Sequence, residues 1–150
     1  MGCFDISDEY NTLLETISGV ALNKMLQALT VEGTTWLKES GEGLLMCSRP
    51  ALKPLAKVWY QAIRTHLLPT THIETLNKER LILLYCILEN RGVNIGKLIQ
   101  RKISACAFKL KGGLFFPSLI TELCLRLGLE ISPADELLPN TGAINTAAIK

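Results

Sequence analysis

The sequence predicts an all-α fold: a single compact domain of about five helices, followed by a mobile C-terminal tail. Three observations lead to this prediction. Apolar residues recur at three- and four-residue intervals along most of the chain, which is the spacing of one helix face. Glycines and prolines fall between these periodic segments, where helices begin and end. The 150 residues, 48% of them hydrophobic, suffice for one domain with a sizeable core.

The first periodic segment predicts a helix from about Asp8 to Leu29, with Ser7 as its N-cap. Gly19 lies inside this segment. Because glycine destabilises a helix interior by about 1 kcal/mol relative to alanine, the helix can break there. A connector follows, which Trp36 and Leu37 are expected to anchor to the core. Its flexibility is indicated by three glycines, Gly33, Gly41 and Gly43.

A second helix is predicted to begin at Pro54, since proline suits the first helical position, and to end before Pro69. Helical spacing divides its residues between two faces. The face expected to point inward holds Leu55, Val58, Trp59, Ala62 and Ile63. The opposite face holds Lys53, Lys57, Gln61 and Arg64.

The third predicted helix spans about Lys78 to Glu89, with Asn77 as its N-cap and Gly92 as its stop signal. Leu76 and Leu81 are spaced for a hydrophobic staple. The interior of this helix is apolar almost all round. A helix of that kind is buried, so this one is expected to be central.

Two further helices are predicted downstream. One runs from about Ile95 to Phe108, and the next begins at Pro117 and ends at Gly128. The apolar stripe of the first consists of Ile95, Ile99, Ile103, Cys106 and Ala107. The inward residues of the second are expected to be Leu119, Ile120, Leu123, Cys124 and Leu127. From about Glu130 the chain holds turn-forming and small polar residues, so residues 130–150 are expected to form a disordered tail.

Composition limits the environment of the protein. The apolar run from Leu81 to Ile87 is far shorter than the roughly 20 residues of a membrane span, so no membrane association is expected. The first residues carry no basic region typical of a secretory signal, which indicates an intracellular protein, with nucleus and cytoplasm both open. The five cysteines include no Cys-x-x-Cys pair, so reduced thiols and no bound metal are expected.

Catalytic motifs are not apparent in the sequence. His66 and His72 are six residues apart on either side of Pro69, which excludes the helical His-x-x-x-His spacing of a metal site. Ser118 lacks the Gly-x-Ser-x-Gly frame of a hydrolase nucleophile. Gly112-Gly113 is not followed by the Gly-Lys-Ser/Thr of a phosphate loop. We therefore expect no enzyme activity and no cofactor.

Charge is unevenly distributed. Residues 1–47 have a net charge of −5, residues 48–128 of +9 and residues 129–150 of −2. No acidic residue occurs between Glu89 and Glu122, a gap that contains six candidate nucleic-acid contacts. They are Arg91, Lys97, Arg101, Lys102, Lys109 and Lys111. The residues would contact phosphates; the alternative is a solvated helix face.

Three sequence blocks carry a family resemblance. They read Leu67-Leu-Pro-Thr-Thr-His72, Glu79-Arg-Leu-Ile-Leu-Leu-Tyr-Cys86 and Leu114-Phe-Phe-Pro-Ser-Leu-Ile-Thr121. Together with Leu55-Ala-Lys-Val-Trp-Tyr60, these blocks resemble the putative plant transposon protein domain over roughly residues 31–129. Residues 1–30 would then be a separate N-terminal helical segment. The resemblance implies an origin in a plant retroelement, and it supplies no catalytic residues.

Three functional hypotheses follow. The first is a non-enzymatic, gag-like domain of a plant transposable element that acts through self-association or through protein or nucleic-acid contacts. The second is a DNA-binding module resembling a helix-turn-helix, built on the third and fourth helices and using the basic segment 91–111. The third is an inactive fragment of a longer reading frame encoded by the element.

Overall fold

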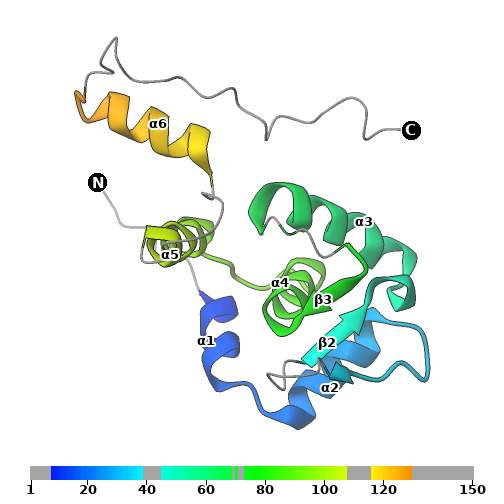
Figure 1. Cartoon of the computed structure of the whole chain (residues 1–150). Helices are drawn as coiled ribbons and strands as arrows, with labels where there is room; N and C mark the ends of the chain where they lie inside the picture. The colour runs from blue at the N-terminus through cyan, green and yellow to red at the C-terminus, as the bar shows by residue number, and fades with distance from the viewer. Residues whose placement is uncertain (1–7, 39–44, 69, 71–72, 108–115, 130–150) are drawn as a thin grey trace, which may run out of the picture. The chain divides into compact units, whose positions relative to one another are not determined.

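The computed structural model describes residues 8–38, 45–68, 70, 73–107 and 116–129. The chain divides into two compact units, residues 1–98 and residues 99–150. Most of the described residues are helical (Figure 1). The predicted tail, residues 130–150, lies outside the described residues.

The predicted first helix is two helices, α1 (Glu9–Thr16) and α2 (Gly19–Leu29). The break falls just before Gly19: Ile17 is extended, and the Ser18 hydroxyl accepts a hydrogen bond of 3.3 Å from the Ala21 backbone N–H. Ser18 therefore caps a new helix where glycine weakens the old one. The N-cap of α1 is Asp8, whose carboxylate accepts from the Asn11 N–H; the predicted cap, Ser7, lies outside the described residues.

A small antiparallel sheet corrects the all-α prediction. Its strands are β1 (Leu37–Lys38), β2 (Leu45–Ser48) and β3 (Thr75–Asn77), in the order β1-β2-β3. Cys47 pairs with Leu76, and both side chains are fully buried. Strands this short are too brief to show the alternating pattern that identifies a strand in a sequence.

The chain then passes through a 3₁₀ turn, η1 (Arg49–Ala51), into α3 (Pro54–Ala62) and a π-helical end, η2 (Ile63–Leu67). Pro54 is the first residue of α3, as predicted. The predicted inward face is wrong in most positions, because Leu55, Val58 and Trp59 are exposed. The buried residues of this segment are Leu52, Ala56, Tyr60 and Ile63. The exposed residues and the buried residues both have helical spacing, so periodicity alone does not show which of the two faces points into the core.

Helix α4 (Lys78–Leu88) is central, as predicted. Leu81 to Leu84 are completely buried, and α4 contacts α1, α2, α3, β2 and β3 (Figure 1). The Asn77 side chain caps the helix by accepting from the Arg80 N–H at 3.1 Å. The sequence predicted the right helix and the right cap.

The stop signal of α4 is Asn90 and not the predicted Gly92. Asn90 has a positive φ of 52°, its N–H donates to the Ile87 carbonyl, and the Arg91 N–H donates to the Cys86 carbonyl at 2.8 Å. This pair of bonds is the Schellman motif. Asparagine tolerates the left-handed conformation better than other non-glycine residues, which explains its use here.

Helix α5 (Ile95–Ala107) starts at the predicted residue, and its first turn is capped by the Asn94 side chain, which accepts from the Lys97 N–H at 2.9 Å. Leu98, which the predicted apolar stripe did not include, is fully buried, whereas Ile95, the first residue of that stripe, is exposed. No described helix is long and apolar enough to cross a membrane.

Helix α6 (Pro117–Arg126) belongs to the second unit; it begins at Pro117, and Gly128, with a positive φ of 79°, is its stop signal, as predicted. Its predicted inward residues are not buried; Leu119, Leu123 and Leu127 are exposed. Helical spacing shows that an apolar stripe exists, but it does not show that another element covers it.

Candidate functional site

The structure describes four of the six predicted nucleic-acid contacts. Arg91 follows the end of α4, Lys97 lies in the first turn of α5, and Arg101 and Lys102 lie further along α5. Lys109 and Lys111 lie outside the described residues. Arg91 and Lys97 belong to the first unit, and Arg101 and Lys102 to the second.

Arg91 is engaged by α1 and by its own helix. Its guanidinium donates to the Glu9 carboxylate at 3.2 Å and lies over the Tyr85 ring, 5.4 Å from the ring centroid. The Tyr85 phenol and the Glu9 carboxylate together raise the pKa of Arg91 above its usual value. The pairing holds α1 against the end of α4.

Lys97 is paired with Asp8, the N-cap of α1, at 3.5 Å. The same carboxylate accepts from the backbone N–H groups of Asn11 and Asn94, each at 3.4 Å. Partial burial raises the pKa of Asp8. The hydrogen bond that its carboxylate accepts from the Asn11 side chain, the two from the backbone N–H groups and the charge of Lys97 outweigh this effect, so the pKa lies below its ordinary value. Asp8 therefore joins the start of α1 to the segment between α4 and α5.

These contacts show that part of the basic segment pairs with acidic side chains at the start of α1. Two of its four described cations are paired with carboxylates more than 80 positions away in the sequence. Arg101 and Lys102 are partly buried, and both have interaction partners. The connection between α4 and α5, residues 89–94, is also longer than the three- to four-residue turn usual in a helix-turn-helix.

Among the described residues of the first unit, three large apolar side chains are exposed together on α3. Leu55, Val58 and Trp59 are 62%, 67% and 43% exposed, and Ala62 is partly buried. These four residues, the α3 stripe, are spaced i, i+3, i+4 and i+7 and carry no charge. The sequence did show this stripe as an apolar face, but it gave no sign that the face is left uncovered.

Histidine and cysteine side chains are candidates for catalysis and metal binding. His66 is exposed near the end of η2, and His72 lies outside the described residues. Cys47 and Cys86 are buried, and burial raises the pKa of each thiol to about 11. In the described ranges, no group of three or more His, Cys, Asp and Glu side chains is arranged to hold a metal ion.

Comparison with known proteins identifies the class to which this domain belongs. Residues 3–130 match the family described as the putative plant retrotransposon-related domain. Because this match spans most of the chain, the chain belongs to that family, and the resemblance predicted from the sequence blocks is confirmed. No curated protein and no solved structure matches the chain.

Proposed function

We propose that this retrotransposon-related domain is non-enzymatic and acts in a gag-like capacity, by associating with a second copy of itself through the α3 stripe. The observation that carries the proposal is the exposure of Leu55, Val58 and Trp59 side by side on one helix. Contiguous exposed apolar surface typically marks an interaction site.

The composition of the α3 stripe favours self-association. Trp59 is of the residue type most enriched among interface residues that dominate binding energy. In a two-fold dimer the same patch of both copies is in contact. A charged residue in the patch would therefore lie near the same charge on the other copy. The α3 stripe contains no charged residue, and two copies can therefore meet there without electrostatic repulsion.

The non-enzymatic part of the proposal is supported by the sequence. The sequence lacks the complete motif of a hydrolase nucleophile, of a phosphate loop and of a helical metal site. A transposase would need several carboxylates to hold two metal ions. The segment from Arg49 to Leu129 has only four acidic residues, Glu74, Glu79, Glu89 and Glu122.

Sedimentation velocity of the full chain over a range of concentrations tests self-association. The chain is expected to shift from monomer to dimer as its concentration rises, and Val58→Glu is expected to abolish the shift. Val20→Glu is the matched control, because Val20 is also a helical valine and is 70% exposed, against 67% for Val58. A monomer at every concentration, or an equal effect of both substitutions, would contradict the proposal.

Nucleic-acid binding through the basic segment is the second candidate, favoured by the absence of acidic residues between Glu89 and Glu122. Lysines predominate there, and a lysine lacks the forked geometry that reads guanine. Binding would therefore be indifferent to sequence and would weaken steeply with salt. Replacing Lys97, Arg101 and Lys102 together by glutamine should flatten the salt dependence. No retention of the unmodified chain on DNA or RNA at low salt would exclude this candidate.

A further inference from the structure

Three arginines from three separate segments lie close enough to one buried tyrosine of the first unit for their charges to act on its hydroxyl group. Arg49 lies in η1, Arg64 in η2 and Arg80 in the first turn of α4. The tyrosine is Tyr60, which α3 directs into the core. We propose that Arg49, Arg64 and Arg80 form a binding site for a phosphate-type oxyanion, a site distinct from both the basic segment 91–111 and the α3 stripe.

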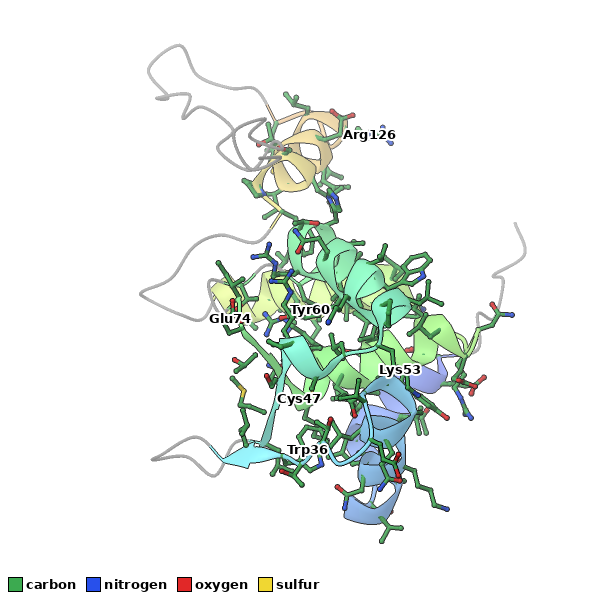
Figure 2. The ribbon with its side chains drawn as sticks, turned by 90° about the vertical axis from the view of Figure 1, so that its right-hand side faces the viewer. Trp36, Cys47, Lys53, Tyr60, Glu74 and Arg126 are labelled. Carbon is green, nitrogen blue, oxygen red and sulfur yellow. The ribbon has the colours of Figure 1, made fainter. Side chains whose placement is uncertain are left out.

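The chain at the start of β3 binds both the Arg49 backbone and the Tyr60 hydroxyl. The Arg49 backbone N–H donates to the Glu74 carbonyl at 2.8 Å, and the Tyr60 hydroxyl donates to the next carbonyl, that of Thr75, at 3.0 Å. Figure 2 shows Tyr60, Glu74 and Cys47 in the same region, between α3 and the strands. Arg49 and Tyr60 are thus held by adjacent residues of one backbone segment.

Arg80 is fixed from the other side. Its Nε–H donates to the Leu68 carbonyl at 3.1 Å, and Leu68 itself ends η2 by donating its N–H to the Ile63 carbonyl at 2.7 Å. This bond places the Arg80 guanidinium at the end of η2, the segment that carries Arg64. The two arginines come from segments that the chain separates by more than ten residues.

Arg64 lies one helical turn after Tyr60. Its terminal nitrogen donates to the Gln61 side chain at 3.1 Å, and its Nε is buried without a hydrogen-bond partner. A buried donor without a hydrogen-bond partner is unfavourable. An anion that draws the guanidinium into a new hydrogen bond would remove this penalty.

The three positive charges act on the same hydroxyl group. Burial raises the pKa of Tyr60, and the charges of Arg80, Arg64 and Arg49 each oppose that increase. Glu79 offsets part of the charge of Arg80. Within the described part of the chain, neither Arg49 nor Arg64 forms an ion pair with a carboxylate. A net positive charge therefore remains near Tyr60.

The chemistry of the cluster favours a phosphate-type ligand. The guanidinium group is planar and presents paired donors that match two oxygens of a phosphate. Because the three side chains are partly and not fully buried, they can reach an anion that enters from solvent. The shared ligand chemistry is the phosphate oxyanion, supplied either by a free phosphate or by the backbone of a nucleic acid.

Isothermal titration of the full chain with inorganic phosphate, and separately with a short single-stranded oligonucleotide, tests the proposal. Arg49→Gln and Arg64→Gln should each weaken phosphate binding about tenfold or more, because each removes a charge-assisted hydrogen bond; a tenfold change corresponds to about 1.4 kcal/mol. Arg126→Gln is the matched control, because Arg126 pairs with Glu122 within α6. Arg80 is left unchanged because it holds the end of η2.

Competition separates the two sources. If phosphate displaces the oligonucleotide and both bind more weakly to Arg64→Gln, the site takes nucleic-acid backbone; if only inorganic phosphate binds, the ligand is a free phosphate. Circular dichroism and the sedimentation behaviour of each variant check that it is folded. Absence of phosphate binding by the unmodified chain overturns the proposal. So does an equal loss in Arg126→Gln, or binding that folded Arg49→Gln and Arg64→Gln variants retain in full.

Discussion

Leu84 shows how a single residue supports the central helix. It is fully buried in α4, which contacts three other helices and two strands. Leu84→Ala should lower the free energy of unfolding by about 2–5 kcal/mol, because it removes buried methyl groups and leaves a cavity. Urea denaturation measures the change. A loss below about 0.5 kcal/mol, the usual size of a surface effect, would show that α4 is not central.

The negative charge of Asp8 is expected to stabilise the folded chain. Its carboxylate caps α1, accepts from Asn94 and pairs with Lys97. Because its pKa is lowered in the folded state, its stabilising contribution is complete above its unfolded pKa and is lost as the pH falls through the lower folded pKa. Asp8→Asn keeps a capping side chain and removes the charge.

The difference in unfolding free energy between the unmodified chain and Asp8→Asn should therefore shrink as the pH falls below about 4. Asp8→Ala should in addition lose the cap, at about 1 kcal/mol, at every pH. Denaturant titrations at several pH values measure both effects. A difference that stays constant down to acid pH would mean that the Asp8 charge has no role in folding.

Single residues also define the limits of prediction from this sequence. Asn77 was predicted as a cap because the local pattern of a capping residue before an apolar run is complete. The partners of Arg91 and Lys97 could not be predicted, because Glu9 and Asp8 lie more than 80 positions away. No local pattern encodes a contact of that separation.

The end of helix α4 depends on the backbone conformation of one residue. Asn90 adopts a positive φ, where glycine is unstrained and a residue with a β-carbon is disfavoured by about 1–2 kcal/mol. Asn90→Ala should destabilise the chain by about 1 kcal/mol, whereas Asn90→Gly should be neutral or stabilising. Thermal unfolding of the two variants compares them. Equal melting temperatures would show that the Schellman motif does not form.

Helices with a clear local sequence pattern were predicted, and elements without such a pattern were missed. α4 was found because an apolar run follows a capping residue, and α5 because apolar residues recur at helical spacing; the Asn94 cap of α5 was not predicted. The short sheet was missed because pairing between β2 and β3 is made by residues almost 30 positions apart. On α3, two stripes of equal helical spacing exist, and only the packing of Tyr60 against β3 decides which one is buried.

At the scale of the whole molecule, the family and the mostly helical architecture were accessible from the sequence, and the surface available for contacts was not. The family was identified by ordered sequence blocks. The α3 stripe became a candidate only once Leu55, Val58 and Trp59 were seen to be exposed. The arginine cluster near Tyr60 likewise depends on contacts between segments distant in the sequence.

The central claim is that two copies meet through the α3 stripe, and site-specific photo-cross-linking tests it most directly. A photoreactive amino acid is placed at Val58 in one sample and at Val20, the exposed control on α2, in another. Irradiation should produce a covalent dimer from position 58 and not from position 20. No dimer from position 58, or equal yields from both positions, would contradict the claim.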